Sequence, residues 1–276
     1  MEPWDLLLIP LGVAVGTFGT LVGAGGGFVL VPVLLLLFPE REPDVITSMS
    51  LLVVCANAAS GSFAYGRQRR IDYSSGVWFA LGTFPGAIVG ALAVGFAPRR
   101  LFDATFATVL SILGLYLIAR RGTTAIQPPI RGRGVVRRDI TDRAGQHFVY
   151  SFQLWKGVLI SAGVGFISSL LGIGGGVIHV PIMATVLHFP IHIATATSQF
   201  VLAFMSGEGT AVHLLTGTLG WDRALTQAAL IAAGAVPGAQ VGARLARRMH
   251  GPAIVRALAV SLVLVGARLG LKAAGI

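Results

Sequence analysis

Two glycine clusters are the part of this sequence whose residue types and spacing best suit chemistry. These glycine triplets consist of Gly25, Gly26 and Gly27 and, later in the chain, of Gly174, Gly175 and Gly176. Successive glycines let the backbone turn several N–H groups toward one point, and a helix that begins after the turn adds the positive end of its dipole. Such a site prefers an anion. Close packing of helices through small residues is the competing interpretation, whereas a P-loop is excluded because no Gly-Lys-Ser/Thr follows either triplet.

Small hydroxyl and amide side chains flank both triplets in the sequence. These candidate donors are Ser50 and Asn57 in the first half and Ser168, Ser169, Thr197, Ser198 and Gln199 in the second. Neutral donors can hold an oxyanion without an intramembrane arginine, whose desolvation is costly. The alternative for any single Ser or Thr in an apolar helix is a hydrogen bond to its own i−4 carbonyl. Because the donors cluster beside both triplets, we predict that they complete a substrate-binding site.

One carboxylate lies inside an apolar stretch. Glu208 shares its segment with Ser198, and His213 follows five residues later. Ionisable residues inside a membrane are functional candidates, so we predict that Glu208 and His213 carry a coupling proton. The alternative places Glu208 near the membrane surface, because only 13 residues separate it from Asp222. His179, shortly after the second triplet, is assigned to the substrate site, with a satisfied core histidine as its alternative.

The sequence lacks the motifs of common enzymes. It contains no H-E-x-x-H, no G-x-S-x-G and no paired acidic motif within its apolar blocks. We therefore predict a protein that is not an enzyme, with no catalytic residues, no cofactor and no metal site.

The composition places these residues in a membrane. Of 276 residues, 54% are hydrophobic and 12% are charged, and the mean hydropathy is +0.79. A soluble domain usually carries about twice this charge and needs more polar surface. The net charge of +10 comes from short arginine clusters between apolar runs, which is typical of cytoplasmic membrane loops and not of a nucleic-acid-binding surface. We predict an integral membrane protein whose partner is the lipid bilayer, with no nucleic-acid partner.

The two halves of the chain repeat one another. Residues 16–32 match residues 165–181 at eight of seventeen positions, which include both triplets. Residues 82–91 match residues 234–243 at seven of ten positions and share the pattern G-x-x-P-G-A-x-x-G-A. Because the blocks occur in the same order in both halves, an internal duplication is the simplest explanation.

The duplication divides the chain into three parts. We predict a first repeat over residues 1–119 and a second repeat over residues 151–276. The polar stretch at residues 120–150 contains seven arginines and reads as a solvated, Arg-rich cytoplasmic linker.

The first apolar block is too long for one membrane-spanning helix. Residues 6–38 would form a helix of about 50 Å, whereas the hydrocarbon core is about 30 Å thick. The first triplet breaks this block, and Pro32 disfavours helix at Val31. Each half is then a glycine-broken hairpin followed by three crossings, and this odd number of crossings inverts the second repeat. The inverted topology puts thirteen arginines on the cytoplasmic side, against eleven for a single broken span that starts inside.

These motifs resemble a known family. The sequence G-A-G-G-G-F-V-L-V-P at residues 23–32, its repeat at residues 172–181 and T-S-Q-F at residues 197–200 are similar to the TauE/SafE sulfite exporter family, also called the TSUP family of anion transporters. The Pro-Gly-Ala block at residues 85–91 and 237–243 belongs to the same pattern. The resemblance spans nearly the whole chain and implies a multi-pass, inner-membrane permease for sulfur-containing anions such as sulfite, thiosulfate or sulfonates. It specifies neither the anion nor the direction, and the Arg-rich linker lies outside its motifs.

Together these observations predict an all-α integral membrane protein of two inverted repeats, each a Gly-broken helical hairpin plus three transmembrane helices. It would move a small sulfur anion by alternating access, coupled to protons. Two alternatives stay open, namely a carrier for an organic carboxylate or another non-sulfur solute, and a non-transporting membrane scaffold. The sequence leaves open whether the chain forms a homo-oligomer.

Overall fold

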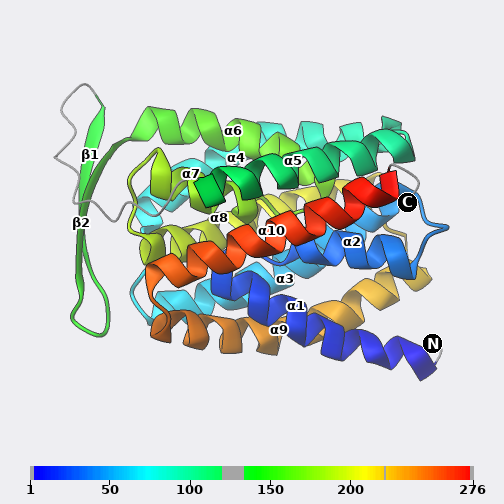
Figure 1. Ribbon diagram of the computed structural model, residues 1–276, viewed down its shortest axis with the longest axis horizontal. Helices are drawn as coiled ribbons and strands as arrows, with labels where there is room; N and C mark the ends of the chain where they lie inside the picture. Colours follow the sequence, from blue (N-terminus) through cyan, green and yellow to red (C-terminus); the bar gives the residue numbers. More distant parts are fainter. Residues whose placement is uncertain (1–2, 120–133, 221, 274–276) are drawn as a thin grey trace.

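The chain folds into a bundle of helices that run roughly along one axis, with a β-hairpin at one end (Figure 1). The computed structural model describes residues 3–119, 134–220 and 222–273. The first half contains η1 (Pro3–Leu7), α1 (Leu8–Val22), α2 (Gly27–Leu37), α3 (Pro43–Arg67), α4 (Tyr73–Ala93), η2 (Val94–Phe96) and α5 (Arg99–Ala119). The second half contains β1 (Val135–Thr141), β2 (His147–Gln153), α6 (Leu154–Leu171), α7 (Gly176–Thr185), α8 (Ile191–Leu215), α9 (Arg223–Arg248) and α10 (Gly251–Ala273). The start of α1 and the end of α10 lie at the end of the bundle opposite the hairpin (Figure 1).

Most of these helices can cross a membrane. Within the described residues, seven are long and apolar enough, namely Trp4–Val22, Pro43–Arg67, Tyr73–Phe96, Arg99–Ala119, Leu154–Leu171, Arg223–Arg248 and Gly251–Arg268. The predicted all-α, multi-pass membrane architecture is thereby confirmed.

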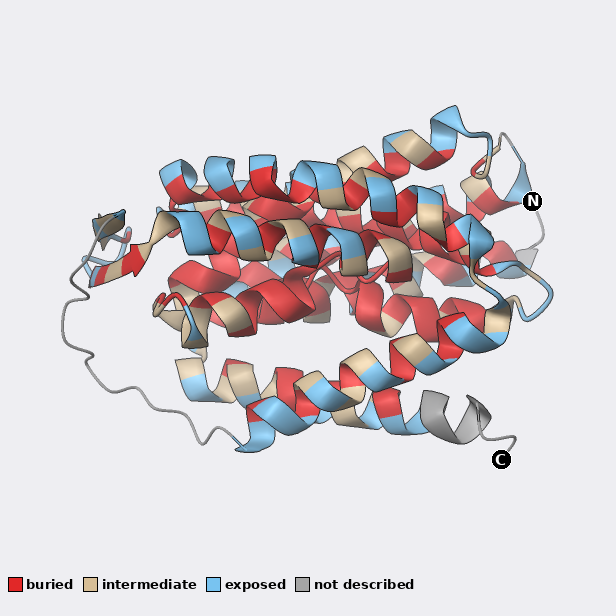
Figure 2. Ribbon diagram, turned by 90° about the horizontal axis from the view of Figure 1, so that it is seen from above, coloured by how far each residue is buried: buried red, intermediate tan, exposed pale blue. Residues whose placement is uncertain are grey.

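Helix α8 is not among the seven, although it has the same length as α3, 25 residues. It carries Ser198, Gln199 and Glu208, which lower its hydropathy. The helix packs against α3 and α4, and buried residues concentrate on the helices in the middle of the bundle (Figure 2). Because neighbouring helices bury Ser198 and Gln199 and partly cover Glu208, α8 can be less apolar than helices that face lipid.

Each glycine triplet interrupts a helical stretch, as the sequence predicts. Helix α1 ends at Gly23 with φ 76°, and α2 begins after Gly26 with φ 88°. Helix α6 ends at Gly172 with φ 66°, and α7 begins after Gly175 with φ 74°. Residues other than glycine rarely adopt this left-handed backbone conformation, so the helices end here because glycine permits it. Helices α2 and α7 have 11 and 10 residues, which corresponds to about half of the hydrocarbon core.

The prediction that Pro32 disfavours helix at Val31 is wrong. Pro32 lies inside α2, and Pro181 lies at the matching place inside α7. A proline without its N–H removes one helical hydrogen bond. Both prolines are buried, so packing against the surrounding helices compensates for the lost bond.

The shared pattern G-x-x-P-G-A-x-x-G-A packs the two halves of the chain together. On α9, a Cβ would meet a carbonyl oxygen of α1 at each of Gly234, Gly238 and Gly242. On α4, a Cβ would meet a carbonyl oxygen of α6 at each of Gly82, Gly86 and Gly90. The spacing of four residues places each set on one helix face. Small-residue packing therefore explains this block, and it joins the broken hairpin of each half to a helix of the other half.

The stretch that the sequence predicts as a solvated linker, residues 120–150, contains most of the β-hairpin, which continues to Gln153. Strands β1 and β2 are antiparallel, with Val135 opposite Gln153 and Thr141 opposite His147. The buried side chains of β2 are Phe148, Tyr150 and Phe152, which contribute to a core cluster with Phe79 and Phe189. This alternation of buried and exposed residues is the sequence signal for a half-buried strand. Residues 135–153 are thus an ordered part of the fold, and residues 120–133 of the predicted linker lie outside the described residues.

Candidate functional site

The two glycine-containing turns meet in the middle of the molecule. We call residues 23–27 the first turn and residues 172–176 the second turn; all of them are buried. A Cβ on Gly27 would lie 2.6 Å from the carbonyl oxygen of Gly172, and a Cβ on Gly176 would meet the carbonyl oxygen of Gly23. The backbone of each turn therefore lies directly against the backbone of the other, which requires glycine. The two triplets that were predicted to share a site lie side by side.

Two serines hold these turns together across the halves of the chain. Ser50 Oγ on α3 donates to the carbonyl oxygen of Gly172 at 2.7 Å, and Ser198 Oγ on α8 donates to that of Gly23 at 3.1 Å. Ser50 and Ser198 occupy matching positions in the duplication, so each half supplies the hydroxyl that binds the turn of the other half. Both hydroxyl groups were predicted to donate to an anion. In this conformation they donate to backbone carbonyls instead.

The two amide side chains that were predicted as donors at the site bind the backbone of the first turn and of α1. Asn57 Nδ2 donates to the carbonyl oxygen of Gly25 at 3.1 Å, and Asn57 Oδ1 accepts a bond from Thr20 at 3.1 Å. Gln199 Nε2 donates to the carbonyl oxygen of Gly19 at 3.2 Å. These bonds satisfy much of the polar surface around the first turn.

The second turn keeps unused donors. The amides of Gly174 and Gly175 have no acceptor within the described residues, and the buried hydroxyls of Ser168 and Ser169 have no partner there either. The Ser168 Oγ would lie 2.9 Å from a Cβ on Gly175, so this hydroxyl lies beside the turn. The amides of Gly26 and Gly27 in the first turn have no acceptor within the described residues either, so unused buried donors border both turns, and the second turn adds the two serine hydroxyls.

Two predicted site residues contact other elements. Thr197 Oγ1 accepts a hydrogen bond from the amide of Asp72, just before α4, at 3.0 Å. His179 on α7 lies beside the ring of Phe79, with centroids 5.8 Å apart, and its Nε2 is 3.1 Å from Ser161 Oγ. His179 is therefore a core residue, but it is not fully satisfied, because its Nδ1 is a buried atom without a hydrogen-bond partner in the described residues.

The two predicted proton-coupling residues lie on the second half of α8. Glu208 Oε2 and His213 Nε2 are buried atoms without a hydrogen-bond partner in the part of the chain that the structure describes, so the two side chains are not joined there through these atoms. A Cβ on Gly209 would lie 3.5 Å from Ser169 Oγ. The segment of α8 that carries Glu208 therefore borders the unused hydroxyls near the second turn.

The polar contacts of the β-hairpin were not predicted from the sequence. Tyr150 Oη donates to Asp72 Oδ2 at 2.9 Å, and Arg138 Nε lies 3.3 Å from the same oxygen. Burial, followed by the charge of Asp72 and the hydrogen bond to it, raises the pKa of Tyr150, so its hydroxyl stays protonated and donates. Because the amide of Asp72 also binds Thr197, one chain of contacts connects the hairpin to α8 beside Ser198. The sequence signal for part of this cluster is the Asp-x-x-Ser start of α4, where Asp72 accepts from the amide of Ser75 at 3.0 Å.

Comparison with known sequences identifies the family of this chain. The family model described as "Sulfite exporter TauE/SafE" matches residues 8–269. The chain is 33% identical over 270 residues to the probable membrane transporter protein YunE of Bacillus subtilis, and the match covers 96% of each chain. It is 29% identical over 224 residues to a probable membrane transporter protein of Methanocaldococcus jannaschii, which covers 78% of this chain and 76% of that protein. No solved structure matches. The predicted family is confirmed: this chain belongs to the TauE/SafE family and is a multi-pass membrane transporter, not an enzyme.

Proposed function

We propose that this protein is a secondary transporter for a small sulfur-containing anion such as sulfite, thiosulfate or a sulfonate. The observation that carries the proposal is the reciprocal pair of bonds from Ser50 to Gly172 and from Ser198 to Gly23. These bonds join the two glycine motifs of the family at one buried point, where each half of the chain closes on the other. In transporters built from repeats, interrupted helices that meet in this way form the substrate site.

The second turn supplies the main donors to the anion in this proposal. The amides of Gly174 and Gly175 and the hydroxyls of Ser168 and Ser169 are buried and unused in the described structure. A charge-assisted hydrogen bond contributes roughly 1.5–3 kcal/mol, so several of them offset much of the cost of dehydrating a dianion. When the halves separate during the cycle, Ser50 and Ser198 release their carbonyl partners and add two more donors. The first turn, with Asn57 and Gln199, forms the opposite wall.

The two halves act as inverted repeats in this mechanism, with residues 120–150 as a cytoplasmic connection. Two observations support this proposal. The chain enters α1 at one end of the bundle and α6 at the opposite, hairpin end (Figure 1). Arg67 and Arg70 at the end of α3 lie in the same pocket as Arg244 and Arg247 near the end of α9, and the positive-inside rule assigns such an end to the cytoplasm.

Proton coupling is assigned to Glu208, with His213 on the same pathway. A carboxylate inside a membrane helix bundle is costly when ionised, so its protonation can be linked to the binding of an anion. The border between the Glu208 segment and Ser169 supports this role, because Ser169 belongs to the proposed anion site.

Uptake by proteoliposomes tests the proposal. Purified protein is reconstituted, and the uptake of labelled sulfite is measured with an imposed pH gradient and in competition with thiosulfate, sulfoacetate and acetate. The proposal expects uptake that sulfur anions inhibit and acetate does not. Inhibition by acetate alone would assign an organic carboxylate instead, and the absence of uptake or exchange of every anion would reject transport through this site.

A further inference from the structure

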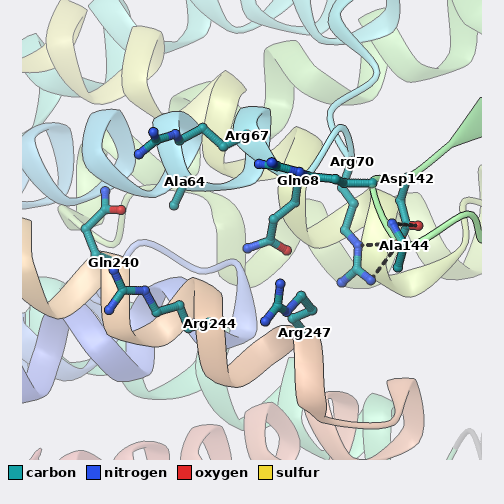
Figure 3. A pocket seen from close by; sticks show the side chains of 10 residues that line it. Ala64, Arg67, Gln68, Arg70, Asp142, Ala144, Gln240, Arg244 and Arg247 are labelled. Carbon is teal, nitrogen blue, oxygen red and sulfur yellow. Dashed lines mark hydrogen bonds and ion pairs between the residues drawn. The ribbon is translucent and has the colours of Figure 1, made fainter.

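Arginines that indicate the orientation of the chain in the membrane converge on one pocket at the hairpin end of the bundle. The pocket has a volume of about 430 Å³. Its charged lining residues are Arg67 and Arg70 of α3 and the turn after it, Asp142 and Arg143 of the hairpin turn, and Arg244 and Arg247 of α9. Figure 3 shows Gln68 and Arg247 between the two helices, and Arg70 bound to Asp142 on the hairpin side.

The charge of this pocket is unbalanced. Five of the lining residues are arginines, and Asp142 is the single carboxylate among them. Within the described residues, Arg70 forms the ion pair with Asp142 at 2.7 Å, and no ion pair is found for the other four. Like charges around a partly enclosed space create a strong positive potential, which raises the local concentration of anions.

Arg70 is the buried and hydrogen-bonded arginine of the pocket. Its side chain is only 5% exposed, although it carries a full charge. Its Nε and Nη2 atoms both donate to Asp142 Oδ2, at 3.0 and 2.7 Å, whereas Nη1 is buried without a partner in the described structure. A buried guanidinium nitrogen without an acceptor is costly, and an oxyanion in the pocket would supply the acceptor.

Surrounding contacts hold the pocket in shape. Gln68 Nε2 donates to the carbonyl oxygen of Ala243 at 3.1 Å, and Gln240 Nε2 donates to that of Ser60 at 2.8 Å, so α3 and α9 are joined on both sides. The amide of Arg143 donates to the carbonyl oxygen of Gln68 at 3.0 Å, which attaches the hairpin turn to the same frame. Three of the arginines are therefore on helices, and the turns that carry Arg70 and Arg143 are attached to them by hydrogen bonds.

We propose that this pocket, the arginine vestibule, is a second anion-binding site that takes a small divalent oxyanion of sulfur or phosphorus before it reaches the central turns. The proposal rests on the proposed function for its place in the cycle. Arg70 Nη1 and the guanidinium groups of Arg244 and Arg247 bind the anion, and Asp142 orients Arg70. The volume leaves room for such an anion together with hydration water, since one water occupies about 30 Å³ of liquid. The site therefore suits an anion that keeps part of its hydration shell.

Anion binding to the purified full-length chain in detergent tests the vestibule. Sulfite and sulfate are titrated by calorimetry into the parent, into Arg244→Gln/Arg247→Gln and into Arg248→Gln, an exposed neighbour on α9 that does not line the pocket. We expect affinity to fall about tenfold or more in the double variant, which corresponds to 1.4 kcal/mol per factor of ten, and to stay unchanged in Arg248→Gln. Arg244→Lys/Arg247→Lys keeps the charge and should restore part of the binding, which separates a charge effect from misfolding. Equal binding by the parent and the double Gln variant would overturn the proposal.

Two further experiments distinguish a free oxyanion from a lipid phosphate and separate the vestibule from the proposed transport function. Native mass spectrometry and titrations in nanodiscs of phosphatidylcholine, with or without phosphatidylglycerol, distinguish a free oxyanion from a lipid phosphate. Arginine-dependent binding of phosphatidylglycerol without binding of sulfite or sulfate would overturn the assignment to a small anion. If arginine-dependent binding is present but proteoliposomes take up no anion, the vestibule holds and the proposed function fails. If uptake is normal and the double variant binds like the parent, the proposed function holds and the vestibule fails.

Discussion

Ser50 on α3 donates a hydrogen bond of 2.7 Å to the carbonyl oxygen of Gly172, 122 residues away in the sequence. Both residues are buried, and the bond crosses from the first half of the chain to the turn that interrupts the second half. Its counterpart joins Ser198 to Gly23. The two central turns are therefore positioned by side chains of the opposite half.

Removing the Ser50 hydroxyl should destabilise the protein. Ser50→Ala leaves the buried carbonyl of Gly172 without this donor, and such a loss costs about 1–3 kcal/mol. We expect a lower Tm in detergent for Ser50→Ala and for Ser198→Ala. Ser62→Ala on the same α3 helix is the control, because the buried Ser62 hydroxyl has no partner in the described structure. Equal Tm changes in Ser50→Ala and Ser62→Ala would contradict a stabilising role of the inter-half bond.

Substitution of Gly175 should impair anion binding more than the loss of a serine. Gly175 has φ 74°, and a Cβ there would lie 2.7 Å from the Met205 methyl group and 2.9 Å from Ser168 Oγ. The left-handed conformation costs an alanine about 1–2 kcal/mol, and a valine more. We expect Gly175→Val to abolish sulfite binding and Gly175→Ala to weaken it. Gly163→Ala in the neighbouring α6 is the control, since nothing lies within 4 Å of its Cβ position.

Calorimetry on monodisperse preparations measures this effect. If Gly175→Val binds sulfite like the parent while Ser198→Ala does not, the backbone of the second turn is not the site and the hydroxyl cluster should be pursued instead.

Glu208→Gln should uncouple transport from the pH gradient. The amide keeps the size of the side chain but cannot take up or release a proton, so anion exchange at equal pH should persist while gradient-driven accumulation is lost. Glu40→Gln, in the exposed loop after α2, is the control and should accumulate anion normally. Parallel measurements of exchange and of accumulation in proteoliposomes distinguish these activities. Normal accumulation by Glu208→Gln would exclude this carboxylate as the coupling group.

The β-hairpin turn should stay attached to Arg70 at neutral pH and detach in acid. Burial acts to raise the pKa of Asp142, but hydrogen bonds from Arg70 and from the amides of Gln146 and Ala144, with the charge of Arg70, outweigh it and lower this pKa below 3.8. A lowered pKa in the folded state means that the stabilisation is fully present above the unfolded value and is lost as pH falls through the folded value.

Hydrogen exchange at the amides of Ala144 and Gln146 measures this attachment. Protection should be constant from about pH 5 to 8 once the intrinsic rates are corrected, and Asp142→Asn should lower it at every pH. Asp139→Asn, on the exposed face of β1, is the control. If Asp142→Asn keeps the protection of the parent, the ion pair with Arg70 does not hold the turn.

The topology predicts which positions react from outside the cell. In a Cys55→Ser background, a cysteine at position 40 should react with an impermeant maleimide in intact cells, because the proposed topology places this loop outside. A cysteine at position 247 should react only after the membrane is opened, since the hairpin end of the bundle would face the cytoplasm. Labelling of position 247 in intact cells would reject the inverted-repeat topology.

The sequence alone determined the membrane architecture and the places where helices break. Long apolar runs need lipid or protein around them whatever their neighbours, and Gly23, Gly26, Gly172 and Gly175 favour positive φ through local backbone sterics. The sequence also identified Ser50 and Ser198 as candidate polar residues of the site, and they lie 148 residues apart, at matching places in the two halves. The local effect of Pro32 was misjudged, because packing around α2 outweighs the loss of a single hydrogen bond.

Only the tertiary structure decided which groups meet. From the sequence alone, the Ser50 hydroxyl could bind a carbonyl of its own helix, an anion or the Gly172 carbonyl. The packing of α3 against the other half selects the Gly172 carbonyl. Likewise, the docking of β2 through Tyr150 on Asp72 and the meeting of Arg70 with Arg247 join residues that are far apart in the chain. Apolar periodicity specifies which face of a helix is buried but not its neighbour, so long-range polar contacts depend on the way the helices pack.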